Sequence, residues 1–254
     1  MAGHFACIGI PASSAEEMNR ALGPLMEAAA WADLPKGGRM GLWRDGAGVL
    51  VSFHMDRQGS IQCCTPGFDG DQRQRVRPTG IHKDHECPYC DMLHVEVLGD
   101  GDAMVYPLAL QVVDIGATRD RIPMKSPVTM KIAAFAEEIA VWADDAAYGA
   151  SQAKEPKFSS ESLIPSGLFG PAPHPHAMLT GHVVAASMKR HEAPFIHMAV
   201  RTFGGTYDVL APVDLLPKPP AAGSVIQGSF WMVGRVVDGL QAAPPLKKKR
   251  FGLF

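Results

Sequence analysis

Short runs of alternating apolar and polar residues, separated by turn residues, constrain the fold of this chain more than any other feature. Such runs lie near residues 40–45, 48–55 and 60–65, with Asp45-Gly46 and Arg57-Gln58-Gly59 between them. The chain contains 26 Gly and 21 Pro among its 254 residues. This content favours many short strands, and the pattern predicts antiparallel hairpins.

One amphipathic helix is expected near the N-terminus. Two overlapping Ser-x-x-Glu capping boxes begin at Ser13 and Ser14. The apolar residues that follow share one helical face: Met18, Ala21, Leu22, Leu25, Met26 and Ala29. Pro24 is expected to kink or split this helix, whose apolar face would cover a sheet. The apolar residues before it, from Phe5 to Ile10, read as a first strand.

The next part of the chain reads as strands with one further helix. Residues 66–81 are polar and rich in Arg, Gly and Pro, which is typical of a loop. Strands are expected near 93–97 and 104–115. The stretch 128–141 fits either a strand or a helix, and a short helix near 144–153 would be capped by Asp144 or Asp145. Residues 1–170 are thus expected to form a β-rich α+β domain with one or two covering helices.

A second domain is expected after a proline-rich linker at 155–176, with a boundary near 170–176. Gly204-Gly205 predicts a tight hairpin. The candidate strands lie near 178–187, 195–203, 206–211 and 224–237. Their number and shortness predict a small β-barrel over residues 177–240, similar to an oligonucleotide-binding (OB) fold, followed by a tail at 241–254.

Charge and cysteine content narrow the class of protein. The formal net charge is −2, so the whole molecule is not a generic binder of polyanions. The sequence has no run of 18 consecutive apolar residues, so no membrane span is expected. The five cysteines include the adjacent Cys63 and Cys64, and an odd count argues against a secreted disulfide framework. We therefore expect a cytoplasmic protein.

The densest group of metal-ligand residue types lies within residues 82–94. A Cys-x-x-Cys turn brings two thiolates together, and zinc takes four such soft or borderline ligands in a tetrahedron. The sequence predicts a structural zinc knuckle with ligands drawn from His82, His85, Cys87, Cys90 and His94.

Two other interpretations of this cluster stay open. Cys87-Pro88-Tyr89-Cys90 resembles the active-site motif of glutaredoxins, which implies thiol-redox chemistry, although here a polar segment precedes it. The residues can also form a polar loop without metal. Catalytic zinc would need a nearby general base, for which Asp84 and Glu86 are available.

Motifs for nucleotide phosphates and for a serine nucleophile elbow are missing. Ser166 and Ser229 are isolated serines without an evident base. His174 and His176 lie in the proline-rich linker, where a solvated loop is expected.

The C-terminal tail combines positive charge with apolar side chains. A docking role is predicted for Lys247, Lys248, Lys249, Arg250, Phe251, Leu253 and Phe254. The ending resembles the terminal motif of bacterial sliding-clamp-binding peptides, which implies a protein partner. The alternatives are a tail folded onto its own domain, or one that contacts nucleic acid or anionic lipid.

Three segments, at 5–11, 161–169 and 228–235, resemble in their order those of a family of bacterial proteins with no established activity. This resemblance implies a bacterial cytoplasmic protein and implies nothing about mechanism. The expected function is a non-enzymatic binding or adaptor protein, stabilised by zinc, with a docking tail. The alternatives are a zinc-dependent or thiol-redox enzyme and a subunit of a larger assembly.

Overall fold

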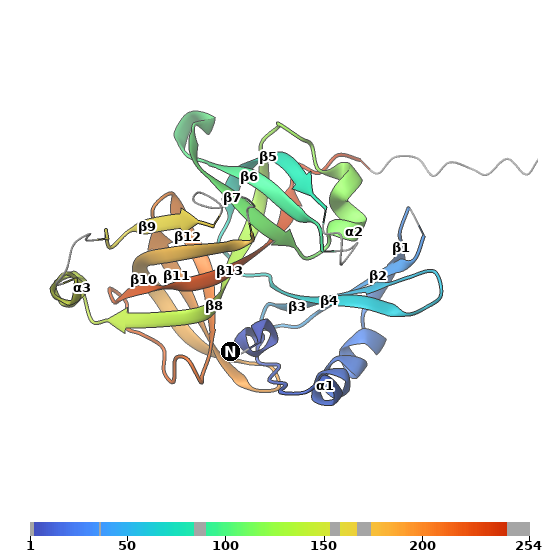
Figure 1. Ribbon diagram of the computed structural model, residues 1–254, viewed down its shortest axis with the longest axis horizontal. Helices are drawn as coiled ribbons and strands as arrows, with labels where there is room; N and C mark the ends of the chain where they lie inside the picture. Colours follow the sequence, from blue (N-terminus) through green and yellow to red (C-terminus); the bar gives the residue numbers. More distant parts are fainter. Residues whose placement is uncertain (1–2, 36, 84–89, 153–157, 167–173, 243–254) are drawn as a thin grey trace, which may run out of the picture.

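The computed structural model describes residues 3–35, 37–83, 90–152, 158–166 and 174–242 (Figure 1). Strands make up 52% of the structure, which confirms the expected β-rich class. They form a four-stranded antiparallel sheet, sheet A, and a larger mixed sheet, sheet B. In the described part of the chain, no helix has both the length and the apolar character needed to cross a membrane.

Sheet A has the strand order β1-β2-β3-β4 and consists of β1 (Ala30–Asp33), β2 (Arg39–Arg44), β3 (Val49–Met55) and β4 (Ile61–Phe68). All three pairings are antiparallel, which confirms the predicted hairpins. The expected loop at 66–81 is wrong, because β4 extends to Phe68 and β5 (Gln74–His82) follows. Pro66 fits this arrangement because β4 is an edge strand, where a missing N–H costs little.

Sheet B contains two rings of hydrogen-bonded strands that share one pair. Its other strands are β6 (Met92–Leu98), β7 (Met104–Val112), β8 (Val128–Trp142), β9 (Ser162–Pro165), β10 (His176–Arg190), β11 (Pro194–Thr202), β12 (Gly205–Pro212) and β13 (Val225–Asp238). One ring runs β8-β12-β11-β10-β13 and returns to β8. The other runs β8-β5-β6-β7-β13 and also returns to β8.

The shared β8–β13 pair crosses the predicted domain boundary. β8 precedes the boundary expected near 170–176, yet it pairs with both β12 and β13. Residues 177–240 cover four of the five strands in the first ring almost completely, but they lack β8. The boundary therefore does not coincide with the edge of a sheet. The OB-like fold and the independent folding of 177–240 stay predictions.

The N-terminus forms a 3₁₀ helix, η1 (His4–Ile8), where the sequence predicted a strand. The chain turns at Gly9, whose φ is +76°, and its carbonyl accepts a hydrogen bond of 2.9 Å from the Ala193 amide. A Cβ at Gly9 would lie 2.3 Å from the Ala193 carbonyl oxygen. The left-handed turn and this close approach hold η1 against the β10–β11 turn.

Local signals near the helices are confirmed. α1 (Ala15–Glu27) begins with Ser14 as its N-cap, and the helix continues past Pro24. α3 (Asp145–Ser151) is capped by Asp144, and the ambiguous stretch before it is the strand β8. The predicted tight hairpin between β11 and β12 is present, but Thr202 pairs with Gly205, so the two loop residues are Phe203 and Gly204, one position earlier than predicted. The remaining helices are α2 (Ile115–Thr118), η2 (Asp100–Asp102) and η3 (Arg119–Arg121).

Two apolar clusters hold these elements together. The larger cluster is formed mainly by residues of sheet B, with Leu93, Ile196 and Phe230 fully buried. The second cluster joins η1, α1 and sheet A to sheet B, through side chains that include Ile8 and Phe135. The second cluster therefore fixes the N-terminal turn on the outer surface of the strands β8, β11 and β13.

Candidate metal centre

Three metal-ligand side chains meet on the outer surface of sheet B. Nε2 of His4 lies 3.2 Å from Oε1 of Glu137, and Nε2 of His176 lies 3.1 Å from the same oxygen. One ligand atom from each of these residues lies within 4.8 Å of the other two. The three residues come from η1, β8 and β10, and we call them the His-Glu-His centre.

A β-bulge directs Glu137 toward the two histidines. Opposite the consecutive residues Ser229 and Phe230 of β13, the partner on β8 changes from Glu138 to Ala136. Glu137 is therefore an extra residue, and a bulge of this kind redirects a side chain from the regular alternation of a strand. A Cβ at Gly228 would lie 2.0 Å from the Glu138 carbonyl oxygen, so glycine allows the strands to approach here.

Neighbouring side chains restrict the orientation of the ligands. The imidazole of His4 stacks on the indole of Trp231, with ring centroids 4.1 Å apart and an angle of 11° between the planes. His176 is paired directly with Trp231 across the β10–β13 ladder. The hydroxyl of Ser229 donates to Oε2 of Glu137 at 3.2 Å. Each ring and each carboxylate oxygen thus has a defined neighbour.

Protonation states in the centre favour cation binding at neutral pH. Burial lowers the pKa of His4, although Glu137 partly opposes this effect. Burial alone would raise the pKa of the Glu137 carboxyl, but hydrogen bonds from His4 and Ser229 and the nearby His176 lower it overall. A neutral imidazole and an ionised carboxylate are the forms in which these side chains bind a metal.

Two of the three distances between ligand atoms are those of hydrogen bonds and are also compatible with a bound metal. Zinc binds histidine nitrogen and carboxylate oxygen at about 2.0–2.2 Å, which places ligand atoms of a tetrahedron about 3–3.5 Å apart. The two N–O distances of 3.2 and 3.1 Å lie in this range. The side chains of His4, Glu137 and His176 are 34%, 27% and 36% exposed. A cation held there would therefore have solvent on its remaining side.

Part of the predicted zinc knuckle lies in the described structure. The rings of His82 and His94 lie 6.2 Å apart on the paired strands β5 and β6. Burial and then the proximity of His82 lower the pKa of His94. Its Nε2 atom is buried and has no hydrogen-bond partner among the described residues.

Of the three other predicted knuckle residues, the structure describes only Cys90. Cys90 is disulfide-bonded, and a disulfide sulfur is not the thiolate that zinc requires. The predicted zinc site therefore applies to the reduced protein. His85 and Cys87 lie outside the described residues, as does the whole predicted docking segment 247–254.

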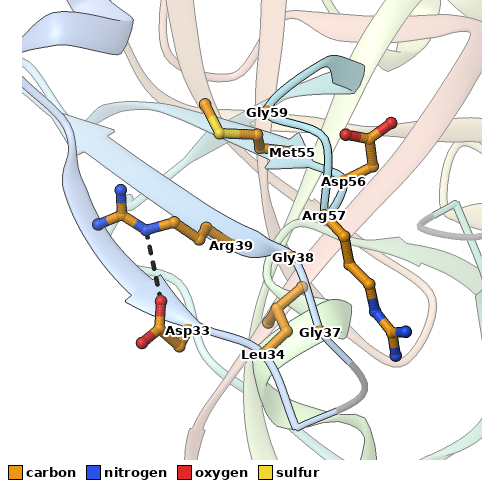
Figure 2. A pocket seen from close by; sticks show the side chains of 9 residues that line it. All are labelled: Asp33, Leu34, Gly37, Gly38, Arg39, Met55, Asp56, Arg57 and Gly59. Atoms are coloured by element: carbon orange, nitrogen blue, oxygen red, sulfur yellow. Dashed lines mark ion pairs between the residues drawn. The ribbon is translucent and has the colours of Figure 1, made fainter.

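A pocket on sheet A offers a less developed alternative. Figure 2 shows it between the β1–β2 and β3–β4 turns, with a volume of about 390 Å³. Its Arg39–Asp33 ion pair measures 3.4 Å, and both side chains are largely exposed. Exposed pairs of this kind contribute little to binding or stability. The pocket borders none of the His-Glu-His residues.

Sequence reasoning missed the His-Glu-His centre. His176 was expected in a solvated loop, but it is the first residue of β10. Ala177 and Leu179 are buried in the core, so the alternation of the strand directs His176 to the opposite, outer side. The polar pair Glu137-Glu138 within an apolar strand was a second available signal. His4 gave no local signal, because it is 133 positions from Glu137 and only the tertiary fold joins them.

Comparison with protein-family models, with curated proteins and with solved structures finds no match for this chain, so its function is argued from geometry and chemistry.

Proposed function

We propose that the protein binds a divalent transition metal, with zinc as the best fit, at the His-Glu-His centre. The observation that carries this proposal is the convergence of two imidazole nitrogens on one carboxylate oxygen, at 3.2 and 3.1 Å. Two histidines and one glutamate form a known ligand set for zinc with an open coordination position. Other divalent metals that accept imidazole and carboxylate ligands compete for such a set.

The exposure of the three ligands favours an accessible metal over a closed structural one. Structural zinc sites use four protein ligands, whereas three protein ligands leave a position for water or another molecule. A metal bound in this way acts as a Lewis acid, which polarises a bound group and lowers the pKa of bound water. Metal-dependent binding or hydrolysis is therefore the function class that this geometry supports best.

Metal binding to the wild type and to three histidine and glutamate variants tests the proposal. Zinc affinity would be measured by competition with a chromophoric chelator for the wild type, Glu137→Gln, His176→Ala and His174→Ala. The His174 side chain is exposed and lies outside the centre, so this variant is the matched control. We expect Glu137→Gln and His176→Ala to weaken binding more than about 100-fold, because even outer partners of ligands are worth 10–100-fold.

The same series in a Cys87→Ser, Cys90→Ser background separates the two candidate zinc sites. Our proposal expects the affinity of the His-Glu-His centre to survive in that background and to fall again with His176→Ala. Zinc binding that is lost with the cysteines and is indifferent to His176 and Glu137 would contradict it.

A structural zinc at the predicted knuckle remains a second candidate, because in the part of the chain that the structure describes the buried Nε2 atom of His94 has no hydrogen-bond partner. Buried polar atoms are usually satisfied, so an unpaired imidazole nitrogen is consistent with a missing ligand. The adaptor role through the tail rests on the sequence of residues 247–254 alone and stays a proposal.

A further inference from the structure

The two oxygens of Glu137 have different partners. Oε1 faces Nε2 of His4 and Nε2 of His176, whereas Oε2 accepts a hydrogen bond from the Ser229 hydroxyl. A free carboxylate can bind a cation through one or both oxygens. Here one oxygen is directed toward the histidines and the other toward a protein donor.

The fold maintains this asymmetry from both strands. Glu137 is the extra residue of the β8 bulge, and Ser229 is one of the two β13 residues opposite the bulge. Its neighbour Gly228 allows β13 to approach the Glu138 carbonyl oxygen, where any Cβ would collide. Ser229 is half-buried, and it pairs with Met178 of β10 on one side and with Glu138 of β8 on the other. The backbone that carries its hydroxyl is therefore fixed.

We infer that Ser229 determines metal specificity by reserving Oε2, so that Glu137 binds the cation through Oε1 alone. This inference rests on the proposed metal centre. With one oxygen from Glu137 and one nitrogen from each histidine, the protein supplies three donors, and one further ligand completes a tetrahedron. Zinc accepts four ligands in that geometry. Mn²⁺ and Mg²⁺ prefer about six ligands that are mainly oxygen, so they are disfavoured.

Ser229 is thus a positioning residue, since it acts through Glu137 and does not itself contact the cation. Without its hydroxyl, Oε2 is free to turn toward the metal and to become a fourth protein donor. The coordination number then rises, and the preference for zinc over larger-coordination metals falls. A role in general packing would change the stability of the protein but would not change the coordination number.

Cobalt(II) reports this difference directly, because four-coordinate cobalt absorbs visible light much more strongly than five- or six-coordinate cobalt. The test uses the full chain carrying Cys87→Ser and Cys90→Ser, so that thiolate ligands do not contribute to the spectrum. In this background we expect intense visible bands for the unchanged centre and weak bands for Ser229→Ala. Zinc affinity should fall about tenfold in Ser229→Ala. The affinity for Mn²⁺ should fall less or rise, so that the zinc/manganese ratio decreases.

Two further variants complete the design. Ser229→Thr retains a hydroxyl and should restore both the cobalt bands and the zinc/manganese ratio. Ser187→Ala removes an exposed hydroxyl from the same sheet and should change neither. If Ser229→Ala fails to fold, the cobalt spectrum of the protein that retains Ser229 still tests the inference, because weak bands there would contradict binding through one oxygen of Glu137.

The outcomes distinguish this inference from the proposed function. If cobalt and zinc do not bind, or bind without any dependence on His176, the proposed metal centre is wrong. If metal binds through His176 but the unchanged centre shows weak cobalt bands, the role of Ser229 is wrong and the metal centre stands. The same conclusion follows if Ser229→Ala keeps the intense bands and the original zinc/manganese ratio.

Discussion

Two of the places in this molecule where a histidine meets another potential ligand differ in their surroundings. In the His-Glu-His centre, His4 and His176 face an ionised carboxylate and are about one-third exposed, at 34% and 36%. On sheet A, Nδ1 of His54 lies 3.5 Å from the Cys63 sulfur, and His54 is fully buried. The first region presents ligands to solvent, whereas the second encloses its histidine.

In the sheet A region, burial strongly shifts the pKa values of both side chains. It lowers the pKa of His54 to about 4 and raises the pKa of Cys63 to about 12. The thiol therefore stays protonated at neutral pH, and thiols in that form neither bind metals well nor react as nucleophiles. Residue types that could form a site are present in both regions, but burial keeps the Cys63 thiol protonated, whereas the pKa of the Glu137 carboxyl is lowered.

The sharpest test of this contrast is the reactivity of Cys63, where the expected effect is largest. Burial raises its pKa from 9.0 to about 12, with the neighbouring Cys64 adding to the shift. A shift of this size leaves about 1000-fold less thiolate at neutral pH. Alkylation by iodoacetamide, followed by mass spectrometry, should be at least about 1000-fold slower for Cys63 in the folded protein than in urea. Comparable rates in the two states would show that His54 activates the thiol, and the contrast between the regions would fail.

The pH dependence of folding tests His54 itself. Its pKa is about 4 in the folded protein and 6.5 ordinarily, so between these values the unfolded chain binds a proton that the folded protein does not. The stabilisation is therefore complete above pH 6.5 and is lost as the pH falls toward 4. A shift of this size corresponds to about 3 kcal/mol of unfolding free energy.

Urea unfolding at pH 7 and pH 4 measures this loss. The wild type should lose about 3 kcal/mol more on acidification than His54→Gln, which cannot titrate at this position. Comparing the two proteins removes the contributions of all other groups. An equal loss in both would mean that His54 is not held neutral by burial.

The smallest expected effect concerns Trp231 in the His-Glu-His centre, whose indole stacks on the imidazole of His4. Trp231→Phe keeps an aromatic face beneath His4 but reduces its area. Aromatic stacking contributes about 0.5–1.5 kcal/mol, so zinc affinity should fall a few-fold. Phe53→Leu, a core change on sheet A, provides the control and should leave zinc affinity unchanged. A larger loss than that of His176→Ala would indicate that Trp231 supports the whole centre.

The sequence predicted local features of this fold well. The helix N-cap at Ser14 and a tight hairpin near Gly204 depend on residues close together in the chain, and both are present. The segment at 66–81 was misassigned because prolines and glycines usually end strands. Pro66 lies on an edge strand, and Pro78 lies next to a bulge, and both places tolerate the missing N–H.

The candidate site was less accessible to sequence reasoning because its parts are distant. Glu137 and His176 are 39 positions apart, and the bulge that directs Glu137 exists only when β8 pairs with β13. Density of ligand residues pointed instead to residues 82–94, because a compact motif is visible without knowledge of the fold. Ligands gathered from a turn and two strands leave no such local pattern.

The β8–β13 pair also sets the order of events during synthesis of the chain. Both rings need this pair, and β8 must wait for a strand that is made about a hundred residues later. Local hairpins such as β11–β12 can form as they emerge from the ribosome, but neither ring closes until residue 238 is available. Until then the edge of β8 that faces β13 has unpaired backbone groups, and an open strand edge of this kind can pair with other chains.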